Sequence, residues 1–127
     1  MLPPVASTVL SLMLLSCLML LSQVQGHLVS VLSAEENSYV SSFLKSRVHN
    51  YLYVWIGLHD PILGYESHGD AWQWSNNNKL KYVNWERNPF TAIDRGYCAS
   101  LTAKSGYMKW RDYPCDMLLP YVCKFKN

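Results

Sequence analysis

The spacing of hydrophobic residues after position 33 predicts a helix with one buried face. Ser33 and Glu36 stand three residues apart, which is the spacing of a capping box that satisfies free amides at a helix start. We expect this helix to run from Ala34 to about Arg47. Apolar residues follow at helical intervals, namely Val40, Phe43, Leu44 and Val48.

The other hydrophobic segments are short and predict β-strands. Tyr51 to Leu58 reads YLYVWIGL between polar and turn residues, so we expect a central strand buried on both faces. Further short strands are expected at Trp72 to Trp74, Tyr82 to Trp85, Cys98 to Leu101, Tyr107 to Trp110 and Tyr121 to Phe125. Long loops are expected at 60–78 and 86–96. One helix with several short strands predicts an α+β fold.

The aromatic residues divide into two sets by their position in this pattern. Those within strand patterns are expected in the core, and they are Trp55, Trp74 and Trp110. Those in or beside loops are the better candidates for an exposed stacking platform, and they are Tyr65, Trp72 and Tyr113.

Residues 1–26 carry no charged, His or aromatic side chain and predict a secretory signal peptide. Val9 to Leu21 is an apolar stretch, and small residues allow cleavage after Gly26. This stretch is shorter than the ~20 residues that a membrane-spanning helix needs. We therefore expect a secreted protein whose folded part is residues 27–127.

Removal of the leader takes Cys17 away and leaves three cysteines in an oxidising compartment. An odd count in a secreted domain indicates an unpaired thiol, an intermolecular bond or a missing partner. The residues alone leave these alternatives open.

The length of 127 residues suits one domain, and the composition excludes several classes of function. No G-x-S-x-G, H-E-x-x-H or glycine-rich phosphate loop occurs, so we expect neither an enzyme nor a cofactor. We expect no metal site, because the spacing of His59, Asp60, His68 and Asp70 fits no zinc pattern. With a net charge of only +2, we expect no nucleic-acid partner.

The charges are unevenly distributed along the chain. Residues 27–78 hold two basic and five acidic side chains, whereas residues 79–127 hold nine basic and four acidic ones. The basic residues either form a face for anionic glycans or lipid head groups, or are separately solvated. They are Lys79, Lys81, Lys104, Lys109, Arg111, Lys124 and Lys126.

Several motifs occur in the order found in C-type lectin-like domains, and the chain resembles that family. They are Trp55-Ile56-Gly57-Leu58, Trp72-Gln73-Trp74, Cys98, Trp110-Arg111-Asp112, Cys115 and Cys123-Lys124-Phe125. The leader, His27-LVSVLS, Trp55-IGLHDP, Trp85-ERNP and Leu119-PYVCKFK resemble the secreted regenerating-islet-derived type III, or pancreatitis-associated, proteins. The resemblance covers nearly the whole chain.

The resemblance implies a C-type lectin-like domain that lacks its N-terminal part. Between the leader and His27, the family carries a pro-segment, a first strand, a hairpin and a first helix with a cysteine, which are missing here. It also implies a disulfide between Cys98 and Cys115, while the helix cysteine that pairs with Cys123 is lost. Cys123 is then an unpaired thiol or the link in a disulfide-bonded dimer. We expect lower stability than in the relatives, because a bridge and a helix are missing.

The resemblance also identifies a candidate ligand-binding loop. In calcium-dependent members, a Glu-Pro-Asn-type and a Trp-Asn-Asp tripeptide supply oxygen ligands to Ca²⁺ and the sugar. Glu66-Ser67-His68 matches the first tripeptide, while Arg111 interrupts the second with a cation, so we expect no calcium site. The type III relatives similarly imply glycan binding through Glu66, Ser67 and His68 without calcium. The alternative is an exposed polar loop with no ligand.

Three functions follow as hypotheses. The first is a secreted lectin-like protein of mucosal or acute-phase defence that binds bacterial cell-wall glycan such as peptidoglycan, or anionic lipid, and is bactericidal in some members. The second is a growth or regeneration signal that acts through a cell-surface receptor, which the family name also implies. The third is an unstable splice form with no activity of its own.

Overall fold

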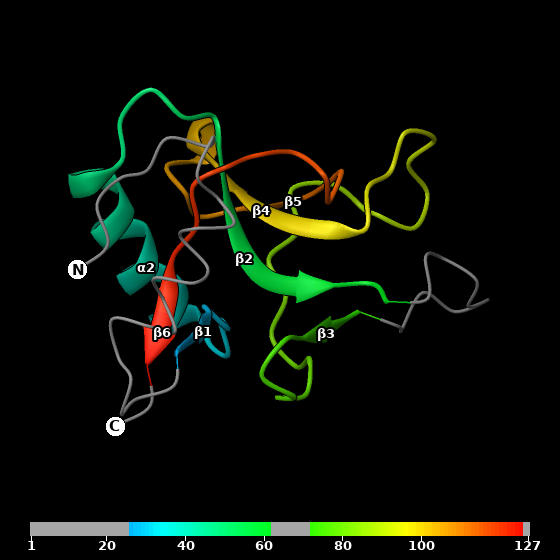
Figure 1. Ribbon diagram of the computed structural model, residues 1–127, viewed down its shortest axis with the longest axis horizontal. Coiled ribbons are helices and arrows are strands. Elements are labelled where there is room, and N and C mark those ends of the chain that lie inside the picture. The colour runs from blue at the N-terminus through cyan, green and yellow to red at the C-terminus, as the bar shows by residue number, and fades with distance from the viewer. Residues whose placement is uncertain (1–25, 62–71, 126–127) are drawn as a thin grey trace.

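The computed structural model describes residues 26–61 and 72–125, which form one helix beside two small antiparallel sheets (Figure 1). The first sheet pairs β1 with β6, and the second has the strand order β3-β2-β4-β5. The elements are β1 (Gly26–Leu28), α2 (Ala34–Arg47), β2 (Tyr53–His59), β3 (Gln73–Trp74), β4 (Cys98–Thr102), the 3₁₀ turn η2 (Ala103–Ser105), β5 (Trp110–Tyr113) and β6 (Cys123–Phe125). The expected α+β class is confirmed.

Strand β2 joins the two sheets and lies at the centre of the fold. The five residues from Val54 to Leu58 are buried, as expected for a strand covered on both faces. The Trp55 amide donates to the carbonyl of Pro120, and the Gly57 amide donates to the carbonyl of Val29, each at 2.9 Å. A Cβ on Gly57 would lie 2.8 Å from the Leu28 carbonyl oxygen, so the close approach of the two chains requires glycine.

Helix α2 begins where the capping box predicts and ends at Arg47, as the spacing of the apolar residues predicts. The Ser33 hydroxyl accepts from the Glu36 amide at 3.1 Å, and the Glu36 carboxylate accepts from the Leu32 amide at 2.8 Å. This carboxylate therefore reaches one residue before the cap, whereas the capping box predicted a bond to Ser33 itself. Val40 and Leu44 are buried, which confirms the apolar face. Within the described residues, no helix is long and apolar enough to cross a membrane.

Trp110 lies at the centre of the larger core, with 0% of its surface exposed. Its ring meets the rings of Trp74, Tyr82 and Trp85 edge to face at 5.5, 5.8 and 5.7 Å. Such pairs stabilise a core beyond the area that they bury. The expected burial of Trp55, Trp74 and Trp110 is confirmed.

Asn37 attaches helix α2 to this tryptophan through buried polar groups. Its side-chain oxygen accepts from the Trp110 Nε1 at 3.0 Å, and its Nδ2 donates to the Met108 carbonyl at 2.8 Å. A buried donor that loses its acceptor costs free energy because water cannot replace the lost bond. These contacts make Asn37 a structural residue, although it is polar and helical.

Substitution of Asn37 by Ala should therefore lower the free energy of unfolding by about 1–3 kcal/mol, since it leaves the buried Trp110 Nε1 without an acceptor. Urea unfolding followed by tryptophan fluorescence measures this loss. The exposed Asn78 supplies a matched control, and Asn78→Ala should shift stability by less than about 0.5 kcal/mol. Equal stabilities for the two variants would contradict the role assigned to Asn37.

Two of the expected strands differ from the observed ones. Residues 82–85 make only a single bridge, between Trp85 and Trp110, so the strand expected from Tyr82 to Trp85 is wrong. The strand expected from Tyr107 to Trp110 is observed three residues later, as β5. Tyr107 has a φ of 61° and ends a turn in which the Ser105 hydroxyl accepts from the amides of residues 108 and 109. This side-chain capping extends the turn into residues of high β propensity.

The cysteines confirm one expectation and correct another. Cys98 and Cys115 form a disulfide across 17 positions of sequence, as the resemblance implied. Cys123 is also disulfide-bonded, so the unpaired thiol expected at this position is wrong. That expectation counted three cysteines after removal of the leader, whereas the full chain has four. The expected disulfide-linked dimer through Cys123 stays a prediction.

Candidate functional site

The loop expected to bind a ligand begins where β2 ends. Glu66, Ser67 and His68 lie outside the described residues, so their predicted roles stay predictions. The described residues on either side of this part of the chain include Asp60, one residue before the last described one, and Trp72, and both are buried. The side chains that contact Asp60 and Trp72 therefore determine where this loop leaves and rejoins the fold.

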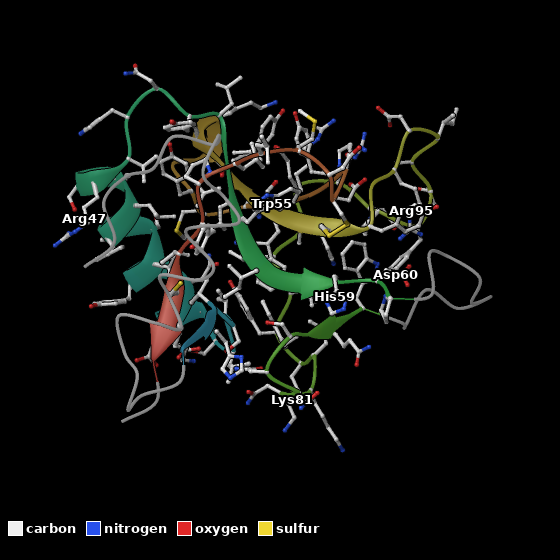
Figure 2. The ribbon with its side chains drawn as sticks, in the orientation of Figure 1. Arg47, Trp55, His59, Asp60, Lys81 and Arg95 are labelled. Carbon is white, nitrogen blue, oxygen red and sulfur yellow. A yellow bond between two sulfur atoms is a disulfide. The ribbon has the colours of Figure 1, made fainter. Side chains whose placement is uncertain are left out.

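Arg95 contacts the chain on both sides of this loop. Its Nη2 lies 3.0 Å from the Asp60 Oδ2, and its guanidinium carbon lies 5.6 Å from the centre of the Trp72 ring. The same guanidinium lies 4.5 Å from the centre of the Tyr97 ring. Figure 2 shows Arg95 and Asp60 beside each other just beyond the end of β2. The salt bridge to Asp60 and the cation–π contact with Trp72 thus join the two sides of residues 62–71.

Trp72 was expected to be an exposed stacking residue, and this expectation is wrong because only 3% of its surface is exposed. Its ring meets Trp85 edge to face at 5.0 Å, and Arg95 lies over it. Tyr113 is half-buried and stacks on Tyr53 at 4.4 Å, so its ring face is also occupied. Tyr65 lies outside the described residues.

A second arginine, Arg87, fixes the Asp112 carboxylate on β5. Arg87 donates to both oxygens of Asp112, through Nε at 2.9 Å and Nη2 at 3.0 Å. The Gly96 amide donates to the Asp112 Oδ2 at 2.7 Å. A Cβ at position 96 would lie 2.2 Å from the Tyr113 carbonyl carbon, so this close approach requires glycine. Arg87 also pairs with Asp94 on the surface, at 3.0 Å.

These contacts settle the protonation state of Asp112. Burial alone raises the pKa of a carboxyl group, but the hydrogen bonds from Arg87 and Gly96 and the charge of Arg87 outweigh it. The pKa of Asp112 therefore lies below its ordinary value, and the hydrogen bond with Asp112 raises the pKa of Arg87. The side chain of Asp112 is fully buried and its oxygens already accept three hydrogen bonds.

The residues of the second tripeptide do not fit a calcium ion. Calcium takes six to eight oxygen ligands, and Asp112 is the carboxylate that this tripeptide would supply. Its oxygens are directed at Arg87 and Gly96, and Arg111 beside it brings a positive charge. A cation at this position would have to displace a buried ion pair, which is costly.

The basic residues of the C-terminal half do not all face solvent freely. Lys124 pairs with Glu36 at 2.9 Å, and Lys109 donates to the Asn84 side chain at 3.0 Å. Lys104 and Arg111 line a shallow pocket beside the exposed Leu52. Lys126 lies outside the described residues. Lys124 thus belongs to an ion pair with helix α2, whereas the exposed Lys79, Lys81 and Lys104 keep the basic-face hypothesis open.

Sequence reasoning missed the two arginines that organise this region. Arg87 and Arg95 lie in the segment expected to be a loop, and they contact residues 25 and 35 positions away. The available signal was Asp112, because an acidic residue inside a strand pattern needs a cationic partner when it is buried. The sequence does not show which arginine supplies that partner.

The fold and its bridge define the class of protein. Residues 20–125 match the family described as Lectin C-type domain. The structure of human lithostathine superposes with a TM-score of 0.77 at 36% identity, covering 93% of this chain and 84% of that chain. The C-type lectin CEL-I from Cucumaria echinata gives a TM-score of 0.67 at 27% identity, covering 81% and 70%. The protein is a C-type lectin-like domain.

Similarity to individual proteins shows which family within this class the chain belongs to. Regenerating islet-derived protein 3-beta of Mus musculus is 45% identical over 173 positions, covering 98% of this chain and 99% of that protein. The Rattus norvegicus 3-beta protein is 57% identical over 101 residues, covering 80% and 58%. The pancreatic beta cell growth factor of Mesocricetus auratus is 54% identical over 112 residues, covering 88% and 62%. The chain belongs to the regenerating islet-derived type III family.

The relatives are longer than this chain within the aligned span. The match to the mouse protein runs over 173 positions and reaches nearly both ends of both proteins, although this chain has 127 residues. A segment is therefore missing from its interior, as the resemblance implied. The matches to the rat and hamster proteins span less than two thirds of those relatives.

Proposed function

We propose that this protein is a secreted lectin that binds bacterial cell-wall glycan, with peptidoglycan as its ligand class, and that it does so without calcium. Membership of the C-type lectin domain family supports carbohydrate as the ligand. The leader pattern of residues 1–26 supports entry into the secretory pathway. The protein acts by binding and catalyses no reaction.

The observation that carries the calcium-independent part of this proposal is the saturated Asp112 carboxylate. With both oxygens held by Arg87 and one also by Gly96, this group offers no position to a cation. The sugar is then recognised by hydrogen bonds alone. A carboxylate such as Glu66 accepts hydrogen bonds from two neighbouring sugar hydroxyls, and Ser67 and His68 beside it supply further polar atoms.

Arg95 supports such a site by fixing where the loop leaves and rejoins the fold. Its contacts with Asp60 and Trp72 come from one side chain that is only 15% exposed. Fixed ends restrict the conformations of the residues between them, which reduces the entropy lost when a ligand binds. Anionic lipid is the second ligand to test, since Lys79, Lys81 and Lys104 are exposed.

A sedimentation assay with insoluble peptidoglycan in EDTA tests the proposal. The wild-type protein should bind equally with EDTA and with calcium, and Glu66→Gln should bind about tenfold more weakly, since a charged hydrogen bond is worth roughly 1.5–3 kcal/mol. Glu35→Gln changes an exposed carboxylate on helix α2 and serves as the matched control. Binding that requires calcium, or equal binding of all three proteins, would refute this assignment.

A growth or regeneration signal acting through a cell-surface receptor is the second candidate function. The observation in its favour is the 54% identity to a hamster protein named pancreatic beta cell growth factor. This function predicts a saturable response of epithelial or islet cells that is the same for wild type and Glu66→Gln. The third candidate, an inactive splice form, predicts that no folded protein reaches the culture medium.

A further inference from the structure

A small pocket of about 180 Å³ lies on the face of the larger sheet that is turned away from the Trp110 core. Tyr53 of β2 lies opposite Thr102 of β4. Arg111 of β5 lies opposite Ser100, two residues before Thr102 on β4. Because successive side chains of a strand point to opposite faces, these residues share one face and Trp110 points to the other. The described residues that line the pocket are Leu52, Tyr53, Glu86, Thr102, Lys104 and Arg111.

Glu86 lines this pocket with a carboxylate oxygen that has no partner. Its backbone amide donates to the Trp110 carbonyl at 2.7 Å, which holds residue 86 beside β5. The Glu86 Oε1 is shielded from solvent, yet no group in the described part of the chain donates a hydrogen bond to it. A buried acceptor without a donor costs free energy, so this oxygen favours a ligand that supplies one.

Two cationic side chains line the same pocket. Lys104 in the turn η2 is exposed, and Arg111 is half-buried. Neither forms an ion pair with another residue that the structure describes. Two positive charges against the one negative charge of Glu86 leave a positive surplus, which a ligand with a single negative charge balances. A guanidinium binds a carboxylate through two parallel hydrogen bonds.

We propose that this pocket binds an acidic sugar, a single ring that carries one carboxylate and several hydroxyl groups. The ligand carboxylate accepts hydrogen bonds from Arg111 and Lys104, and one ligand hydroxyl donates to the Glu86 Oε1. Leu52 and Tyr53 supply an apolar wall for the carbon face of the ring.

The size and charge of the pocket select this ligand class. A water molecule occupies about 30 Å³ of liquid, so the pocket has the volume of roughly six waters, which suits one sugar ring. A zwitterionic amino acid would leave the positive surplus unbalanced, and a neutral sugar would give the two cations no counter-charge. This proposal does not depend on glycan binding through Glu66.

Titrations of the isotope-labelled protein with small ligands test the ligand class. NMR follows the backbone amides of Glu86, Lys104 and Arg111, which should shift in a saturable manner with D-glucuronate. D-Glucose lacks the carboxylate and glycine has no net charge, so both should bind at least about tenfold more weakly. Binding of D-glucose or glycine as tight as that of D-glucuronate would overturn the proposal.

Variants of the lining residues test the assigned contacts. Lys104→Gln and Arg111→Gln should each weaken D-glucuronate binding about tenfold, since each removes a charged hydrogen bond. Glu86→Ala should remove the preference for D-glucuronate over acetate, which has no hydroxyl. The dispersion of the amide resonances reports that each variant is folded, and Lys104 is exposed, so its substitution leaves the core intact.

Lys79→Gln is the matched control, because it removes an exposed lysine that is not among the described lining residues. This variant should bind D-glucuronate as the wild type does. Equal weakening by Lys79→Gln and Lys104→Gln would show that diffuse positive charge attracts the ligand, and it would overturn the assignment of a pocket. Wild-type affinity in the Lys104→Gln and Arg111→Gln proteins would overturn it as well.

Discussion

Replacement of Asp112 by Asn should lower the free energy of unfolding at pH 7 by about 3 kcal/mol. The variant leaves the Arg87 guanidinium without its buried counter-charge, and breaking a buried ion pair costs roughly 3–5 kcal/mol. The lower end applies because Arg87 remains 27% exposed and keeps Asp94 as a partner. Urea unfolding followed by fluorescence or circular dichroism measures the loss.

The difference between wild type and this variant should shrink in acid. The pKa of Asp112 is lowered on folding, so its contribution to stability is fully present above the ordinary pKa of about 3.9 and is lost as pH falls through the lowered value. Asp94→Asn is the matched control, because it removes an exposed partner of the same arginine and should cost at most about 1 kcal/mol. A cost for Asp112→Asn that stays constant down to pH 2 would contradict this account.

Removal of the Cys98–Cys115 disulfide should have an effect of similar size. The bridge closes a loop of 17 positions that contains β4, η2 and β5, and the chain-entropy model assigns it about 3 kcal/mol. The double variant Cys98→Ala and Cys115→Ala should therefore unfold about 10–20 °C below wild type. Differential scanning calorimetry measures the shift.

The double variant is more informative than a reducing agent. Cys123 is bonded as well, so dithiothreitol breaks more than the 98–115 bridge, and the Tm of the reduced wild type should fall below that of the variant. If the variant and the wild type unfold at the same temperature, the closed loop does not stabilise the domain.

Sequence predicts those parts of the fold whose structure depends on residues close together in the chain. The start of helix α2 follows from Ser33 and Glu36, which satisfy amides within four residues of themselves. The burial of Trp74 follows from strand alternation. Trp72 shares that alternation, yet its position beside a long loop suggested exposure, and Arg95 from another segment covers it. A contact between side chains that lie far apart in the sequence cannot be predicted from the residues around either one.

In the candidate site, too, some features could be predicted from the sequence and the contacts between distant residues could not. The disulfide between Cys98 and Cys115 followed from family resemblance, and the rejection of a calcium ligand set followed from the charge of Arg111. Neither the pairing of Arg87 with Asp112 nor that of Arg95 with Asp60 has a fixed spacing in sequence. Cys123 was misassigned because the count of cysteines depended on whether the leader is removed.

The contacts of Arg95 with Asp60 and Trp72 have a consequence for protein engineering. Because one guanidinium contacts the chain on both sides of residues 62–71, we expect β2 and β3 to keep their structure when a foreign peptide replaces these residues. In a library of peptides inserted at this position, the contacts of Arg95 would hold the two ends of each insert close together. The domain is thus suited to the display of peptides. The inserted residues would determine what is bound, and the sheet would determine the stability of the fold.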